Sequence, residues 1–248
     1  MEIGIDGFVK ELSEDGVRCI LQVRHAERPK MDPDDPTFGD NLPITEEGER
    51  TARRLGEMLA DFGGDVQFAS SPLRRTRMTA ELIAAGMGVA SPEIPVDDLI
   101  GNGSFFYADV AAVLDVFKPE NFFNACFEYF RTGEQKGFRN INAAADDLED
   151  WLLARLERKL FVVTTHDCFI AAFLAAKARM SFSRGNWPRF LDGGALFLRP
   201  DGTKSYALVR TGLSAGICGV DGTVMSRGDV VAKTAARNFF TSVGFFLV

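Results

Sequence analysis

Histidine and cysteine are scarce in this chain. Its 248 residues include two histidines, His25 and His166, and four cysteines, none of which forms a CxxC pair. Cysteines spaced this widely do not suggest a disulfide framework, so we expect reduced and mostly buried thiols in a cytoplasmic protein. Any chemistry that needs imidazole must use one or both of the two histidines.

Long apolar runs and an excess of positive charge are also missing. No run reaches the roughly 20 apolar residues that span a bilayer, and the acidic start over residues 1–6 differs from the basic and then apolar pattern of a signal peptide. The net charge of −7 and the pI near 5.0 argue against a nucleic-acid surface. We therefore expect no membrane and no nucleic-acid partner, although a local arginine cluster can still bind a small anion. The oligomeric state is left open.

Both histidines stand at the end of a short apolar run. His25 follows closely on the run 19–23, and His166 follows the run 160–165. Each run is typical of a buried strand. Ligand crevices in open α/β sheets lie at the carboxyl ends of the strands, and the unperturbed pKa of histidine lies near neutral pH. The pattern predicts that the two histidines share one functional site.

The rest of the chain alternates between predicted helices and strands. Apolar spacing predicts a helix over residues 5–12, and Thr45, with two acidic residues after it, predicts the N-cap of a helix that runs to Asp61. The further elements expected are a strand at 66–69, a helix opened by Ser70-Ser71-Pro72, a helix at 142–158, a helix at 168–177, a hairpin of 195–199 with 205–209, and a second hairpin and a last helix beyond Gly219.

Residues 101 to about 140 interrupt this alternation and are rich in aromatic side chains. They form either a helical insertion that packs its own small core or a cap over the crevice that shapes substrate choice, and both interpretations can hold together. Because the chain has no internal repeat and no linker, we predict one domain over residues 1–248 that carries this insertion.

Three short segments carry the most specific pattern. They are Arg24-His25-Ala26-Glu27-Arg28, the run SPLRRTRMTA over residues 71–80, and Thr165-His166-Asp167, and Thr45-Glu46-Glu47-Gly48 adds a fourth match. Together they resemble the histidine phosphatase superfamily, the phosphoglycerate-mutase-like fold, with its Arg-His-Gly signature, its Ser-Pro-Leu-x-Arg-x-x-x-Thr-Ala helix start and its second histidine strand. The resemblance covers about residues 18–210. It implies a three-layer α/β/α fold with a mainly parallel sheet.

The resemblance assigns a role to each histidine. It implies that neutral His25 attacks phosphorus and forms a phosphohistidine, which splits one hard displacement into two easier ones. It also implies that His166, in its protonated form, faces the same phosphate as a hydrogen-bond donor. The partner is then a small phosphorylated substrate, and no cofactor is expected.

Positive charge for the phosphate is expected from three arginines. Phosphoryl transfer requires positive charge around the phosphate oxygens, and Arg24, Arg28 and Arg75 can bind them with planar, permanently charged forks. The family pattern aligns Arg75 with the catalytic arginine of the second segment, whereas Arg74 and Arg77 are expected on the solvated side of that helix. A metal site is not expected, because three arginines in one pocket would repel a cation.

The leaving group needs a proton, and the family offers two sources. The mutase-like branch uses a glutamate in a Leu-x-Glu context, and the nearest counterpart here is Gly101. The acid-phosphatase branch uses the aspartate of a His-Asp pair, and Asp167 directly follows His166. Asp167 is therefore the predicted general acid, with Glu27 second and a carboxylate of the insertion, such as Asp109, third. The structural alternative for Asp167 is a helix N-cap.

The predicted function is metal-independent hydrolysis of a phosphomonoester through a phosphohistidine intermediate. The alternatives within enzymes are a phosphoglycerate-mutase-like phosphotransferase and a protein phosphohistidine phosphatase. The alternative from another class is a catalytically silent phosphate-binding module. It is supported by the missing glutamate and by Ala26, which replaces the family's glycine. A methyl group at Ala26 is costly if φ is positive there and harmless if φ is negative.

Overall fold

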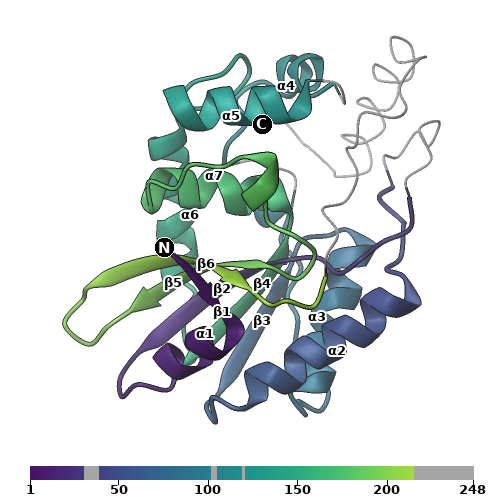
Figure 1. The fold of residues 1–248 in the computed structure, drawn as a ribbon, viewed down its shortest axis with the longest axis vertical. Helices are drawn as coiled ribbons and strands as arrows, with labels where there is room; N and C mark the ends of the chain where they lie inside the picture. Colours follow the sequence, from purple (N-terminus) through teal and green to yellow (C-terminus); the bar gives the residue numbers. More distant parts are fainter. Residues whose placement is uncertain (31–38, 102–104, 119–120, 215–248) are drawn as a thin grey trace.

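Five of the six strands in the described sheet run in one direction. The computed structural model describes residues 1–30, 39–101, 105–118 and 121–214, and the sheet has the order β1-β6-β5-β2-β4-β3 (Figure 1). β5 is antiparallel to both of its neighbours, and all other pairs are parallel. The strands are Glu2–Gly4 (β1), Arg18–Arg24 (β2), Val66–Ser70 (β3), Leu160–Thr165 (β4), Gly193–Leu198 (β5) and Lys204–Arg210 (β6). The predicted, mainly parallel sheet is confirmed.

Helices cover both faces of the sheet, which confirms the three-layer α/β/α architecture (Figure 1). Alternate residues of β2 pack against the helices on opposite faces of the sheet, because successive side chains of a strand point to opposite faces. Leu21 packs in the core under α1, α2 and α3, and Ile20 packs in the core under α6 and α7. The helices are Ile5–Leu12 (α1), Glu46–Ala60 (α2), Arg74–Gly86 (α3), Ile141–Leu153 (α6) and Asp167–Lys177 (α7).

Most predicted elements are present. The first helix, the two strands that end at the histidines and the β5–β6 hairpin lie where the sequence places them. Thr45 is the N-cap of α2, and its Oγ1 accepts the Gly48 N–H at 2.9 Å. The short β1 was not predicted. Its three residues are too few for a pattern, and it is held by parallel pairing with β6 at the edge of the sheet.

The helix predicted to open at Ser70-Ser71-Pro72 begins later, at Arg74. Ser70 still belongs to β3, and the Ser71 N–H donates to Thr164 O of β4 at 3.1 Å. The strand pairing therefore extends past the position at which the proline suggested a helix.

The helix predicted to reach residue 158 ends at Leu153. The cause is a side chain from β3, because Gln67 Oε1 accepts the N–H groups of Glu157 and Arg158, both at 2.7 Å. The hairpin and the last helix predicted beyond Gly219 lie outside the described residues.

The aromatic residues of the insertion pack in two places, a small separate cluster that includes Trp187 and the core under α6 and α7. The helices of the insertion are Val110–Val116 (α4) and Phe122–Thr132 (α5), and α5 lies beside α7 (Figure 1). Phe123 is buried together with Ala171 of α7 and Trp187, and Phe106 belongs to the core under α6 and α7. The cap over the crevice and the single domain over residues 1–248 stay predictions.

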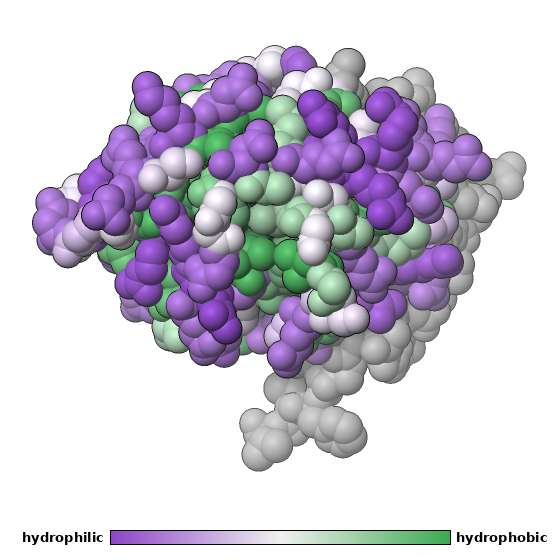
Figure 2. All heavy atoms as spheres, turned by 90° about the horizontal axis from the view of Figure 1, so that it is seen from below, coloured by the Kyte–Doolittle hydropathy of each residue, from purple (hydrophilic) through white to green (hydrophobic). Residues whose placement is uncertain are grey.

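Hydrophilic side chains cover most of the molecular face shown in Figure 2, and hydrophobic side chains are visible between them. Among the described residues, the large hydrophobic side chains that are exposed are Met1, Val96 and Leu99. None of the described helices has the length and apolar character needed to cross a membrane.

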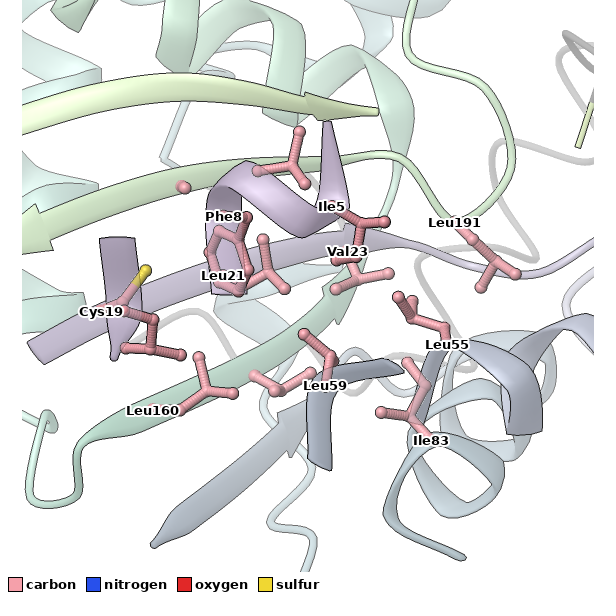
Figure 3. Close-up of a cluster of buried hydrophobic side chains, with 14 of the residues drawn as sticks. Ile5, Phe8, Cys19, Leu21, Val23, Leu55, Leu59, Ile83, Leu160 and Leu191 are labelled. Carbon is pink, nitrogen blue, oxygen red and sulfur yellow. The ribbon is translucent and has the colours of Figure 1, made fainter. Parts of the chain in front are cut away.

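Two glycines allow α2 and α3 to pack closely. Leu55 of α2 and Ile83 of α3 lie in the buried cluster shown in Figure 3. A Cβ on Gly56 would lie 2.1 Å from Ile83 O, and a Cβ on Gly86 would lie 2.1 Å from Arg53 O. Backbone atoms cannot move aside as a flexible side chain can, so this helix spacing requires glycine at both positions.

We expect Gly86→Ala to lower the free energy of unfolding by about 1–3 kcal/mol, because the methyl group must push α3 away from α2. The matched control is Gly7→Ala in α1, where a Cβ would meet only Ile3 Cβ, at 3.9 Å. Its stability should be unchanged or raised, since alanine favours a helix more than glycine does. Urea unfolding measures both variants, and equal stabilities would contradict the close helix contact.

Candidate active site

Parallel pairing of β2 with β4 brings the two histidines together. Arg24 is in register with Thr165, so the residues that follow leave the sheet at the same edge. The His25 N–H donates to Thr165 O at 3.1 Å. The ring centroids of His25 and His166 are 5.5 Å apart, and both residues are buried. The structure therefore brings the two histidines together as expected, and their shared functional role stays a prediction.

The hydrogen bond of the His25 ring determines which of its nitrogens can react. Nδ1 lies 2.8 Å from Ala26 O. A carbonyl oxygen can only accept, so Nδ1 carries the hydrogen and Nε2 of the neutral ring keeps its lone pair. Ala26 does not have a positive φ, since the described non-glycine residues with positive φ are Ser91, Arg179 and Leu191. Alanine therefore fits after His25 without backbone strain.

Two helices hold the loop that follows His25. The Ala26 N–H donates to Thr79 Oγ1 of α3 at 3.0 Å, and the Thr45 N–H at the start of α2 donates to Glu27 O at 2.8 Å. A Cβ on Gly48 would lie 2.4 Å from Glu27 O, so this approach of α2 requires glycine. The half-buried Glu27 carboxylate contacts Thr45 Oγ1 at 3.4 Å.

Arg24 is the most buried of the predicted phosphate-binding arginines. Its Nη1 donates to Pro188 O at 2.6 Å, and its Nη2 lies 3.1 Å from Asp167 Oδ2. The guanidinium carbon stands 4.4 Å from the centroid of the Phe190 ring. Its Nε has no hydrogen-bond partner within the described part of the chain. A buried donor without a partner costs free energy, and an oxygen of a bound anion would satisfy it.

The other two predicted arginines lie at the ends of loops around the histidines. Arg75 is in the first turn of α3 and Arg28 is three residues after His25, and both are half-buried and bound to backbone carbonyls. Arg74 and Arg77 are exposed, which confirms the prediction that they lie on the solvated side of α3.

Ser71 orients the second histidine. His166 is the N-cap residue of α7, and its Nε2 lies 3.3 Å from Ser71 Oγ, which in turn lies 2.7 Å from Thr76 Oγ1. The Thr76 hydroxyl has a carbonyl acceptor, Leu73 O, at 2.7 Å. The proton assignment that keeps every contact therefore has Ser71 donating to Thr76 and accepting from the Nε2–H of His166.

Burial lowers the pKa of His25 well below its usual value, and the charges of Arg75, His166 and Arg24 lower it further. Burial is also the largest cause of the lowered pKa of His166, followed by Arg75, Arg24 and Arg28. A lowered pKa means that the ring takes up a proton only at more acid pH. Both rings are therefore neutral near pH 7 with the protein's own groups alone. The predicted protonated form of His166 therefore needs a bound anion to offset the arginine charge, and it stays a prediction.

The predicted general acid, Asp167, lies beside Arg24, and three groups of the described residues donate to its carboxylate. Its Oδ1 accepts the Cys168 N–H at 2.9 Å, and its Oδ2 accepts the Trp187 indole N–H at 2.9 Å and faces Arg24 at 3.1 Å. Asp167 is the first residue of α7 and not its N-cap. Its catalytic role stays a prediction.

Gly101, the nearest counterpart of the glutamate of the mutase-like branch, has little room for a side chain. A Cβ on Gly101 would lie 2.6 Å from both Ser71 Cβ and Pro72 Cδ. The third predicted acid, Asp109, caps α4 and accepts a backbone N–H of that helix at 3.2 Å. Of the predicted acids, this leaves Asp167, which directly follows His166, and Glu27, which lies two residues after His25.

Comparison with known proteins decides the family. The sequence profile of the histidine phosphatase superfamily, branch 1, matches residues 20–198, a span that contains both histidines, the three arginines and Asp167. The chain belongs to this superfamily. The predicted resemblance and the prediction of a phosphatase enzyme are thereby confirmed. No curated protein matches the chain in sequence.

Three solved structures are similar to this histidine phosphatase, and the first of them supports the fold. A mycobacterial hydrolase is 18% identical with a TM-score of 0.51, and the match covers 89% of this chain and 97% of that one. A mycobacterial glucosyl-3-phosphoglycerate phosphatase is 18% identical with a TM-score of 0.48, covering 77% and 97% of the two chains. The protein histidine phosphatase SixA, complexed with tungstate, is 13% identical with a TM-score of 0.44, covering 76% and 93%.

Sequence reasoning missed three contributors to this histidine phosphatase site. Ser71 and Thr79 stand inside the second motif, and their hydroxyls hold the His166 ring and the Ala26 N–H. Their signal was the motif itself. Trp187 belongs to no motif, and its single signal is that the chain has two tryptophans.

We expect both histidine rings of this phosphatase to resist protonation, because burial and the arginines lower their pKa. In ¹H–¹⁵N spectra of the ring nitrogens, both should stay neutral at their ordinary titration point of about pH 6.5. Inorganic phosphate should move the protonation of His166 to higher pH, since the anion offsets the arginine charge. A His166 signal that titrates near pH 6.5 without phosphate would contradict this electrostatic interpretation.

Proposed function

We propose that this histidine phosphatase hydrolyses a small phosphomonoester through a phosphohistidine on His25, without a metal ion. The main support is the contact of His25 Nδ1 with the Ala26 carbonyl, which leaves Nε2 as a neutral nucleophile. Attack on phosphate requires such an unprotonated nitrogen next to fixed positive charge.

The reaction then has two steps. In the first, Nε2 of His25 forms a bond to phosphorus while the P–O bond to the leaving alcohol breaks, and the leaving oxygen takes a proton from Asp167. In the second, water gives a proton to Asp167 and attacks phosphorus, the N–P bond breaks and phosphate leaves. His25 ends neutral and Asp167 ends protonated, so one water is consumed for each alcohol and phosphate formed.

The protein supplies the positive charge that the transferring phosphoryl group needs. Arg24 and Arg75 offer bidentate forks, and α3 and α7 both begin beside the histidines, where the N-terminus of a helix favours an anion. A divalent cation would have to enter next to three arginines. Within the described ranges, no group of three or more His, Cys, Asp or Glu side chains is arranged to hold a metal ion. We therefore propose catalysis without metal or cofactor.

Asp167 must carry a proton when the leaving group departs. Its Oδ2 accepts the Trp187 indole N–H and lies beside the Arg24 guanidinium. A bound phosphate dianion would draw Arg24 to itself. Glu27 is the second candidate for this role.

Three other functions give different products. A phosphotransferase needs a second alcohol as acceptor, a protein phosphohistidine phosphatase needs a phosphorylated protein, and a binding module releases nothing. The crowding at Gly101 weighs against a mutase that uses a glutamate there. We further propose that the enzyme acts in the cytoplasm, where thiols stay reduced, and Cys19, Cys126 and Cys168 are free.

We expect p-nitrophenyl phosphate labelled with ³²P to leave an acid-labile, base-stable label on the protein, because an N–P bond has that stability. EDTA in the buffer should not reduce the label, and His25→Ala should abolish both label and turnover. Mass spectrometry of the quenched enzyme identifies the labelled residue. Label elsewhere than on His25, or activity lost to EDTA and restored by a divalent cation, would overturn the mechanism.

We expect Asp167→Asn to cripple hydrolysis of phenyl phosphate by about 10²- to 10⁴-fold, the usual contribution of a general acid. Hydrolysis of p-nitrophenyl phosphate should be affected far less, because p-nitrophenolate departs without a proton. The measurement is kcat/KM for both substrates, with Glu27→Gln as the parallel variant. An equal loss on both substrates in Asp167→Asn, together with a selective loss in Glu27→Gln, would move the role to Glu27.

A further inference from the structure

Trp187 touches the proposed proton donor from outside the catalytic motifs. It follows the short 3₁₀ helix Arg184–Asn186, and 1% of its surface is exposed. Its indole N–H donates to Asp167 Oδ2 at 2.9 Å. An indole nitrogen can only donate, and a carboxyl group retains an acceptor lone pair when it is protonated. This contact can therefore persist in both forms of Asp167 that the reaction requires.

The other two contacts of Asp167 do not hold its carboxyl group against the rest of the site while substrate is bound. The Cys168 N–H belongs to the next residue of the same helix, so it does not tie the carboxyl group to the rest of the site. Arg24 is a predicted phosphate ligand, and a bound phosphate would draw its guanidinium away from Asp167. When substrate is bound, Trp187 is the contact from outside α7 that still holds Asp167.

The insertion determines where Trp187 lies. Four phenylalanines of α5 have ring centroids 5.1–6.1 Å from that of Trp187, and they are Phe122, Phe123, Phe127 and Phe130. The ring centroid of Phe182 lies 6.2 Å from that of Trp187. Edge-to-face and stacked rings at these distances attract each other beyond simple burial. The aromatic content of the insertion thus keeps one N–H group pointed at Asp167.

We infer that Trp187 is a positioning residue for Asp167, and that the insertion acts on the chemistry by holding Trp187 in place. The inference rests on the proposed role of Asp167 as proton donor. It gives the aromatic insertion a catalytic task that is separate from any contact with the substrate.

The test is Trp187→Phe, which keeps an aromatic ring in the cluster and removes the N–H. We expect kcat/KM for phenyl phosphate to fall roughly tenfold or more, the effect of losing one hydrogen bond to a charged group. For p-nitrophenyl phosphate the loss should stay below about twofold, since proton donation matters little there. The Ki of inorganic phosphate should not change, because the anion-binding residues are untouched.

The chain provides a matched control in its other tryptophan. The Trp151 indole nitrogen is buried and lacks a hydrogen-bond partner among the residues described, so Trp151→Phe removes the same group where it makes no such bond. Both kcat/KM values should equal those of the wild type. In an Asp167→Asn background, Trp187→Phe should add no further dependence on the leaving group, because the two residues act as one unit.

Each result decides the inference. A selective loss on phenyl phosphate in Trp187→Phe alone supports it. Equal losses on both substrates, or a changed Ki for phosphate, would show a structural role and overturn it. If Trp187→Phe does not fold, the alternative is β-(3-benzothienyl)alanine at position 187 in a Trp151→Phe background. This residue keeps the ring size of tryptophan and replaces its N–H by sulfur. The same criteria then apply. Wild-type enzyme without turnover or His25 label would instead refute the proposed function itself.

Discussion

The pairing of β2 with β4 is the constraint on which the rest of the site depends. The strands are far apart in sequence, yet their parallel register sets Arg24 opposite Thr165 and so brings His25 and His166 to one edge of the sheet. β3 pairs with the other side of β4, which brings Ser71 and the start of α3 to the same edge. A register shift of one residue would turn every side chain of a strand to the opposite face. The catalytic constellation is therefore a property of the sheet order.

Concentrated positive charge is the second constraint. Arg24 is buried against Asp167 and a backbone carbonyl, and the pKa of both histidines is lowered first by burial and then by the charge of the arginines. Leu191 adopts a left-handed conformation, with φ of 66°, and its N–H donates to Arg24 O at 3.2 Å. Such backbone strain persists where the surroundings enforce it, often at functional sites. The protein keeps its cationic groups in place before a phosphate arrives, and a bound anion would relieve their mutual repulsion.

The sequence predicted what local patterns determine. The apolar runs before the two histidines identified both strands, and Thr45 identified the start of α2, because capping and burial leave signals within a few residues. The end of α6 at Leu153 could not be predicted, since Gln67 causes it from a distant strand. Whether Ala26 is harmless depends on the sign of its φ, which the sequence alone does not determine and which is not positive in the structure.

The proposed choice of proton donor also depends on packing between distant segments, which the sequence does not show. In the sequence, Gly101 indicates only that a glutamate is missing. In the structure, Gly101 packs so closely on Ser71 and Pro72 that a side chain does not fit there. The proposed acid, Asp167, directly follows His166, so the two residues share one stretch of backbone at the start of α7. Any displacement of α7 then moves both groups together. Trp187 donates one hydrogen bond to Asp167 at this helix start, and its ring packs on the insertion. A change in how the insertion packs can therefore reach the chemistry without any change in the motifs.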